Sequence, residues 1–174
     1  MAKREALREL QARIAQRMQV ASTSDSPQSW LAVECAGHGL LFPLAQAGEI
    51  FSVPPLMPVP HTQHWFIGVA NLRGGLHGVI DLAAFLGVRG DAEIPREQAR
   101  LIAINPALEV NGALLVDRLA GLRSPTQLEA AAVGEQRAAP AFVGASWRDS
   151  DGRSWQELDL STLSHDEHFL RIGG

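Results

Sequence analysis

Residues 68–87, GVANLRGGLHGVIDLAAFLG, decide the fold. Two apolar runs flank the short polar and glycine segment at residues 73–75. Glycine adopts the backbone angles of a tight turn without steric cost. We therefore predict a β-hairpin, with one strand entering over 68–72 and the other returning over 76–81.

The predicted turn gives particular roles to its residues. Gly74 and Gly75 shape the turn, and Arg73 lies at an exposed tip. There its planar guanidinium can bind a partner's carboxylate or carbonyl groups, and the alternative is an internal ion pair with Glu49. Asn71 either contributes to binding or braces the turn by bonding its backbone.

Two enzymatic interpretations of the same stretch are less favourable. Its glycines match neither GxGxxG nor GxxxxGK[ST], and the element after Gly75 is β-like, so no helix N-terminus is available to bind phosphate. Asp81 and Asp117 each end an apolar run, as a catalytic acid at a barrel rim would. Aspartates also cap turns and helical turns, and we assign both to structure.

Cys35 lies within a strand pattern and is predicted to be buried and unreactive. We predict no catalytic residues.

Composition limits the possible partners and compartments. The chain has 174 residues, 46% of them hydrophobic, and a net charge of −4. These values indicate one domain or two small subdomains with a common core, and they argue against nucleic acid as the main partner. Cys35 is the single cysteine, which indicates a reducing compartment. No run approaches the roughly 18–20 apolar residues of a membrane span, and no secretory signal is evident. We predict a cytoplasmic protein without membrane insertion.

Candidate metal ligands are too few and too scattered. His61 and His64 form one spaced pair, and His165 and His168 another, but zinc requires three or four convergent ligands. Residues 149–152, DSDG, resemble the start of a calcium loop without its remaining ligands, so a hairpin turn explains them better. We predict no metal and no cofactor.

The N-terminal segment differs from the rest of the chain. Apolar residues recur at near-helical spacing over 3–20, which predicts an amphipathic helix, and a polar linker follows up to residue 27. The helix either docks on its own domain or binds a partner.

Short apolar runs separated by Gly and Pro dominate the remainder. Candidate strands lie at 30–36, 39–44, 49–53, 65–70, 76–81, 100–104, 112–117, 141–147 and 153–158. Short helical turns are predicted at 82–86, at the alanine-rich stretch 128–133, and at 159–163 with Asp159 as cap. This pattern indicates a mainly β protein built as a sandwich or small barrels.

The hairpin stretch resembles the signature of CheW-like domains, G-V-x-N-L-R-G followed by P-V-I-D-L and L-G. Further segments resemble the family in the same order: Glu49-Ile50, Val59-Pro60, residues 113–117 (ALLVD) and residues 155–160 (WQELDL). The resemblance covers residues 28–165, leaving an N-terminal segment at 1–27 and a C-terminal tail at 166–174.

This resemblance implies two five-stranded, SH3-like β-barrels around a shared hydrophobic core. It also implies a non-enzymatic adaptor whose partners are the cytoplasmic tip of a methyl-accepting chemotaxis receptor and the regulatory domain of a CheA-type histidine kinase. The positions that match family residues tied to receptor or kinase coupling are Glu49, Gly68, Asn71 and Arg73. Gly68 would let a partner's backbone approach closely, while Gly74, Gly75 and Asp81 would be structural.

Two positions depart from the family pattern. Gly78 stands where the family usually has Pro, and Ala83 where Arg often follows D-L. With these two departures and its basic N-terminal extension, the chain resembles the PilI-type adaptors of type IV pilus (twitching motility) systems. The alternatives are an adaptor of a flagellar or non-motility pathway, or a small-molecule-binding β-barrel that uses Asp81 and the histidines.

Overall fold

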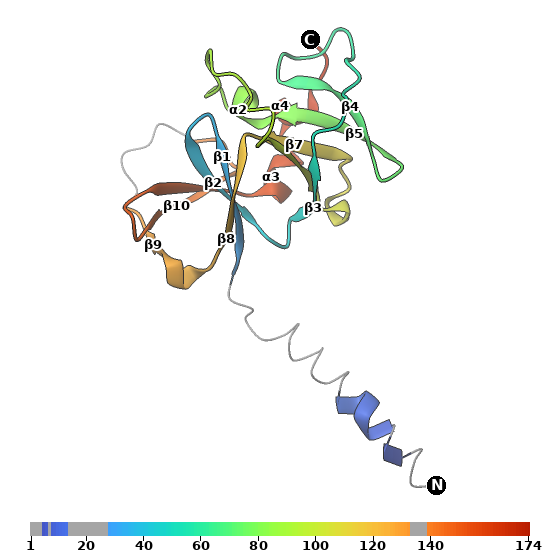
Figure 1. Cartoon of the computed structure of the whole chain (residues 1–174), viewed down its shortest axis with the longest axis vertical. Coiled ribbons are helices and arrows are strands. Elements are labelled where there is room, and N and C mark those ends of the chain that lie inside the picture. The colour runs from blue at the N-terminus through green and yellow to red at the C-terminus, as the bar shows by residue number, and fades with distance from the viewer. Residues whose placement is uncertain (1–4, 7, 14–27, 133–138) are drawn as a thin grey trace.

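Two β-sheets form most of the structure, a computed structural model that describes residues 5–6, 8–13, 28–132 and 139–174 (Figure 1). The strands are β1 (Trp30–Cys35), β2 (His38–Pro43), β3 (Ala47–Ser52), β4 (Phe66–Leu72), β5 (Gly75–Asp81), β6 (Arg100–Ile104), β7 (Gly112–Val116), β8 (Arg118–Arg123), β9 (Leu128–Ala130), β10 (Val143–Asp149) and β11 (Ser154–Leu158). The helices are short: α2 (Leu82–Phe85), α3 (Leu160–Leu163), α4 (Glu167–Leu170) and the 3-10 turns η1 (Pro106–Leu108) and η2 (Pro125–Gln127).

The two sheets share one pattern of pairing. Sheet A has the order β8-β1-β2-β11-β10-β9, and sheet B has the order β3-β6-β7-β5-β4. Each contains an antiparallel hairpin (β1–β2, β4–β5) whose second strand pairs in parallel with a strand much later in the chain (β11, β7). That later strand then pairs antiparallel with β10 or β6. The similar pairing of the two sheets is not visible in the sequence, which has no internal repeat.

The predicted fold class is confirmed, and each of the nine predicted strands overlaps an observed one. The predicted strand number of sheet A is wrong, because it has six strands instead of five. Residues 128–133 were expected to be helical, yet Leu128–Ala130 form β9, since they pair with β10. Strand β8 was not predicted; it pairs with β1 across a bulge, and Gly121 has a φ of 90°.

The sheets share a hydrophobic core, as predicted. Its largest cluster takes Leu31 and Phe42 from sheet A and Ile80 and Leu114 from sheet B. Each sheet also has a smaller cluster of its own, in sheet A around Trp155 and in sheet B around residues that include several alanines. A strand that contributes to the shared core with one face and to its own sheet's cluster with the other is buried on both faces, which explains the apolar sequence of β7.

The β4–β5 turn has the predicted position but different key residues. Arg73 and Gly74 both have positive φ, 50° and 79°, as a type I′ turn requires at its two central positions. Gly75 is not one of them: it pairs with Leu72 as the first residue of β5. Gly74 therefore occupies the turn itself, whereas Gly75, also expected to shape the turn, belongs to the strand.

Both ends of the chain add short helical segments. Residues 5–6 and 8–13 are helical, as predicted, and they are exposed, while the remainder of the predicted 3–20 helix and the linker to residue 27 fall outside the described residues. At the other end, Phe169 of α4 is buried in the shared core and stacks on Trp65 with ring centroids 6.3 Å apart. The last residues lie beside the loop before β4, where the Gln63 amide donates to the Ile172 carbonyl. No helix in the described part of the chain is long and apolar enough to cross a membrane.

Candidate docking surface

Glu49 and Arg73 meet on the surface of sheet B. Glu49 lies on β3 and Arg73 at the tip of the β4–β5 hairpin, and Arg73 Nη2 is 2.8 Å from Glu49 Oε1. The internal pairing considered for Arg73 is therefore present. The Arg73 side chain remains 76% exposed and the Glu49 side chain 44% exposed. Exposed pairs contribute only about 0–1 kcal/mol, so a partner can replace this contact at little cost.

Asn71 braces the hairpin tip. Its Oδ1 accepts a hydrogen bond of 2.9 Å from the Gly74 amide, which is the bracing role considered for it. By closing the turn, this bond fixes the direction in which Arg73 projects.

Gly68 is buried, and the backbone that approaches it is the chain's own. Val69 and Met57 exchange two backbone hydrogen bonds of 2.9 Å along the outer edge of β4. Gly68 has a φ of 140°, and an added Cβ would lie 2.5 Å from the Met57 carbonyl oxygen. The expected approach by a partner's backbone does not fit this geometry, and Gly68 supports the surface from beneath.

Two large apolar residues close in sequence to the ion pair are exposed. Ile50 follows Glu49 on β3, and Leu76 lies opposite Asn71 in the hairpin. Both are large hydrophobic residues that remain exposed. We call Glu49, Ile50, Asn71, Arg73 and Leu76 the hairpin surface. Apolar groups beside an exchangeable charge pair are features that protein interfaces use.

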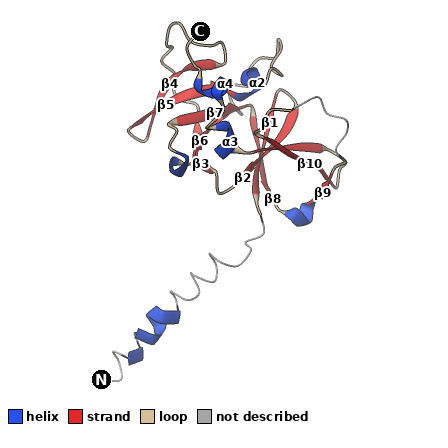
Figure 2. Cartoon of the chain, turned by 180° about the vertical axis from the view of Figure 1, so that it is seen from behind, coloured by secondary structure: helices blue, strands red, loops and turns tan. Residues whose placement is uncertain are grey.

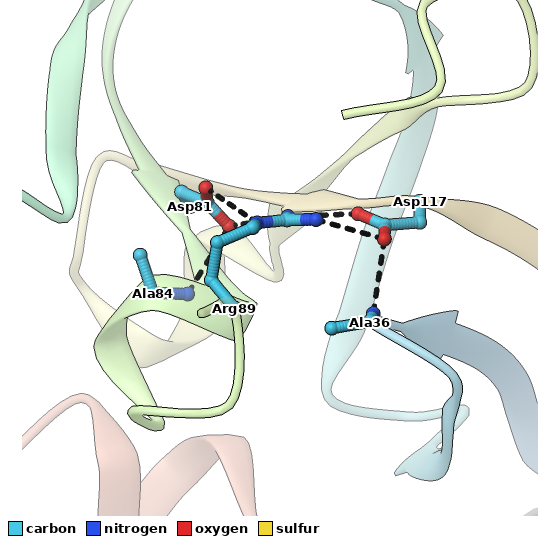
Figure 3. Close-up of polar contacts among 5 residues, drawn as sticks. All are labelled: Ala36, Asp81, Ala84, Arg89 and Asp117. Carbon is cyan, nitrogen blue, oxygen red and sulfur yellow. Dashed lines mark hydrogen bonds and ion pairs between the residues drawn. The ribbon is translucent and has the colours of Figure 1, made fainter. Parts of the chain in front are cut away.

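A buried charge cluster joins the two sheets (Figure 3). Arg89, in the loop after α2, donates to both carboxylate oxygens of Asp81 (2.7 and 3.1 Å) and of Asp117 (2.8 Å each). Asp81, assigned to structure from the sequence, ends β5 and caps α2 by accepting a hydrogen bond from the Ala84 amide. Asp117 accepts a hydrogen bond of 2.9 Å from the Ala36 amide in the β1–β2 turn. The cluster therefore connects sheet B to sheet A.

Arg89 is the principal residue that sequence reasoning missed. Its side chain is only 11% exposed. Burial alone lowers the pKa of a guanidinium, but hydrogen bonds from Arg89 to Asp117 and Asp81 outweigh burial and raise its pKa above the ordinary value. Buried carboxylates need a cation as partner. The two aspartates that end apolar strands could therefore have indicated that a basic residue such as Arg89 lies between them.

The other sequence candidates have structural roles. Burial raises the pKa of the Cys35 thiol to about 12, which keeps it protonated and unreactive. Asp149 Oδ1 accepts hydrogen bonds from the Asp151 and Arg153 amides, so the DSDG segment is the β10–β11 turn. Among the described residues, no three His, Cys, Asp or Glu side chains converge as a metal site would require.

A hollow of about 960 Å³ beside the charge cluster bears on the small-molecule alternative. Asp81 and Arg89 lie at this hollow, which is otherwise mainly apolar. No histidine is among its lining residues, all of which are described, and the Asp81 carboxylate is already held by Arg89. The predicted combination of Asp81 with histidines is absent from this hollow.

A second charge cluster lies on sheet A. Glu34 of β1 accepts hydrogen bonds from Arg118 Nε, at 2.6 Å, and from Arg153 Nη1. The bond from Arg118 is the main cause that lowers the pKa of Glu34 to about 2, against the opposing effect of burial. Arg153 also lies over the Trp155 ring, 4.6 Å from its centroid.

This cluster makes stability depend on pH. Because the folded pKa of Glu34 is depressed, its contribution is present above the unfolded pKa and is lost as the pH falls from about 4.5 toward about 2. Glu34→Gln should cost about 1–2 kcal/mol at neutral pH, after allowance for solvent screening. Denaturant unfolding of both proteins at several pH values measures the difference. A difference that stays constant down to the acid end would contradict this role.

Comparison with known proteins identifies the family. The CheW-like domain family matches residues 29–168. The chain belongs to the CheW-like family. Members of this family are non-enzymatic scaffold or adaptor proteins of chemosensory signalling.

Individual CheW-like relatives agree with this assignment. The chain is 31% identical over 101 residues to the protein PilI of Pseudomonas aeruginosa, covering 57% of this chain and 55% of PilI. It is 29% identical over 97 residues to the chemotaxis protein CheW of Thermotoga maritima, covering 56% of this chain and 62% of CheW. The matched parts thus span less than two thirds of either relative. The crystal structure of the scaffolding protein TtCheW from Thermoanaerobacter tengcongensis has the same fold, with a TM-score of 0.63, 20% identity, and coverage of 76% of this chain and 88% of TtCheW.

Proposed function

We propose that this CheW-like chain couples a methyl-accepting chemotaxis receptor to a CheA-type histidine kinase, in a pathway that controls type IV pilus twitching motility. The similarity to PilI favours the pilus branch over flagellar or non-motility pathways. The single observation that carries the coupling role is the exposed Glu49–Arg73 ion pair, which joins β3 to the tip of the β4–β5 hairpin. The proposed site of action is the cytoplasm, where the tips of such receptors lie.

The hairpin surface has the physical properties that docking requires. The turn holds Arg73 in a fixed direction, since Asn71 bonds the Gly74 amide and Gly68 allows the chain to pack behind β4. Rigid presentation lowers the entropy that binding would otherwise cost. We propose that residues 28–165 form the adaptor domain and that the segment 1–27 is accessory to it.

A binding experiment tests the coupling role. The full chain is immobilised, and a receptor cytoplasmic tip and a kinase regulatory domain, encoded by neighbouring genes, are applied separately and together. Binding to both supports the proposal, and binding to neither refutes it. If those neighbouring genes serve flagella or no motility system, the pilus assignment is wrong while the adaptor role stands.

Reversal of the charge at the hairpin tip should separate binding from folding. Arg73→Glu places two like charges together and removes the anchor for a partner carboxylate, so we expect receptor binding to weaken about tenfold or more. The free energy of unfolding should change by less than about 1 kcal/mol, because the pair is exposed. Titration calorimetry and denaturant unfolding measure the two effects.

The matched control is Arg96→Glu, which makes the same charge change at an exposed arginine away from the hairpin. It should leave receptor binding unchanged. If Arg73→Glu unfolds the protein, or if both variants bind equally well, Arg73 is not a docking residue.

A further inference from the structure

The asparagines of the chain differ sharply in chemical reactivity. They are Asn71, Asn105 and Asn111, and only the last is followed by glycine. The side-chain amide of an asparagine can react with the backbone nitrogen of the next residue, which closes a five-membered succinimide ring and releases ammonia. A following glycine favours this reaction, because it has no Cβ to hinder the approach and its backbone turns easily. Asn111 and Gly112 therefore form the most reactive pair of this kind in the sequence.

The surroundings of Asn111 leave its side chain accessible. Asn111 lies in the short loop between η1 and β7, and it is exposed. Within the described residues its side-chain amide has no hydrogen-bond partner. Gly112 is the first residue of β7, and the antiparallel pairing of β7 with β6 extends only as far as Ala113. The end of a strand opens more readily than its centre, and such an opening brings the Gly112 nitrogen within reach of the Asn111 side chain.

The other two asparagines are protected by their neighbours. Asn105 is followed by Pro106, whose nitrogen carries no hydrogen and cannot act as the nucleophile. The Asn105 side chain is also held, because its Oδ1 accepts a hydrogen bond of 3.0 Å from the Ala107 amide. Asn71 Oδ1 accepts a hydrogen bond from the Gly74 amide, and the leucine that follows Asn71 carries a branched side chain that hinders attack. The structure thus separates one free asparagine from two that are restrained.

We propose that Asn111 is a site of spontaneous deamidation, in which the Gly112 nitrogen attacks the side-chain carbonyl carbon of Asn111. The Gly112 amide loses its proton to solvent, a bond forms between its nitrogen and Asn111 Cγ, and the side-chain nitrogen takes up a proton and leaves as ammonia. Water then opens the succinimide. Opening at the side-chain carbonyl gives aspartate, and opening at the main-chain carbonyl gives isoaspartate. The overall change consumes one water and releases one ammonia, without any cofactor.

The isoaspartate product disturbs sheet B, because it lengthens the main chain by one carbon where β7 begins. The Asn111 carbonyl accepts a hydrogen bond of 2.9 Å from the Gly78 amide, and Gly78 lies opposite Gly112 where β5 and β7 run side by side (Figure 2). The additional carbon moves this carbonyl out of register with the Gly78 amide. Since β5 is the returning strand of the β4–β5 hairpin, deamidation weakens the support of the hairpin surface. This inference goes beyond the proposed function and does not depend on it.

Incubation of the full chain at neutral and mildly alkaline pH, followed by digestion with trypsin and tandem mass spectrometry, tests the proposal. Trypsin releases residues 101–118, which contain both Asn105 and Asn111. We expect a mass gain equal to water minus ammonia at Asn111 and none at Asn105, relative to a sample that was not incubated. The rate should rise with pH, because the Gly112 amide must lose its proton. It should lie within about tenfold of the rate in the free 101–118 peptide, since a strand end opens at little cost in free energy.

Gly112→Ala is the variant that isolates the attacking residue. An added Cβ would lie 3.4 Å from the nearest Ile104 atom, an ordinary contact, so the variant should fold. We expect deamidation to slow about tenfold or more, because the Cβ hinders the approach of the nitrogen. Gly173→Ala, the same change where nothing lies within 4 Å of the added Cβ, should leave the rate unchanged. Equal reaction at Asn105, a folded chain more than about tenfold slower than the free peptide, or an unchanged rate in Gly112→Ala would each overturn the proposal.

The structural consequence is measured on the isoaspartyl form, which is separated from the native chain by ion exchange. Its matched control is Asn111→Asp, which adds the same negative charge and keeps the length of the main chain. Hydrogen exchange of the Gly78 amide should be about tenfold or more faster in the isoaspartyl form and unchanged in Asn111→Asp. Equal exchange in the two proteins would show that the register of β5 and β7 survives the modification.

Discussion

Arg89→Met should destabilise the protein by about 3–5 kcal/mol, because it leaves Asp81 and Asp117 buried without their cation. In the native protein, four hydrogen bonds from Arg89 satisfy both carboxylates and connect the two sheets. Methionine keeps the length of the side chain and supplies no charge. Denaturant unfolding at neutral pH, followed by fluorescence of the four tryptophans, gives the difference in free energy.

A triple variant shows whether charge is the cause. Adding Asp81→Asn and Asp117→Asn removes both buried charges, and the amide oxygens can still accept from the Ala84 and Ala36 amides. We expect this variant to recover most of the lost stability. Arg96→Met, in the same loop region but exposed, should be nearly neutral. A cost below about 1 kcal/mol for Arg89→Met would mean that the cluster does not hold the sheets together.

Gly68→Ala should cost about 2–4 kcal/mol, the second largest effect expected. The residue has a φ of 140°, which strains any side chain, and a Cβ would lie 2.5 Å from the Met57 carbonyl oxygen. Backbone atoms cannot turn aside as a flexible side chain can, so the edge of β4 or the loop at Met57 must shift. Thermal and denaturant unfolding measure the loss, and faster amide exchange at Val69 locates it.

Gly74→Ala is the natural comparison. This glycine also has positive φ, 79°, but nothing lies within 4 Å of an added Cβ. Replacing it with alanine should lower the free energy of unfolding by only about 1 kcal/mol, because only the unfavourable backbone angle contributes and no clash is added. Equal costs at both positions would show that the approach of Met57 contributes nothing.

The sequence was a good guide to structure wherever neighbouring residues determine it. Short apolar runs separated by Gly and Pro located nine strands, and the segment 73–75 located the hairpin turn, although Gly75 itself belongs to β5. Aspartate caps were also readable, since Asp81 and Asp159 accept from amides three residues onward. Each of these features depends on a short window of chain.

Features that depend on distant pairing were missed. Residues 128–133 favour helix by their own alanine content, but hydrogen bonds to β10 make Leu128–Ala130 a strand. Arg89 lies in a loop without pattern, and only the fold brings it between Asp81 and Asp117. At the candidate site, the sequence indicated Glu49 and Arg73, whereas the buried position of Gly68 required knowledge of where Met57 packs.

The order of the strands has a consequence for how the chain folds. Sheet B is built from one continuous stretch between Ala47 and Val116, whereas sheet A joins residues before that stretch to residues after it. In particular, the parallel pairing of β2 with β11 brings Gly39 beside Trp155. During synthesis sheet B can form as soon as it leaves the ribosome, while the β1–β2 hairpin must wait for the last third of the chain. We therefore expect a folding intermediate in which sheet B is complete and sheet A remains open.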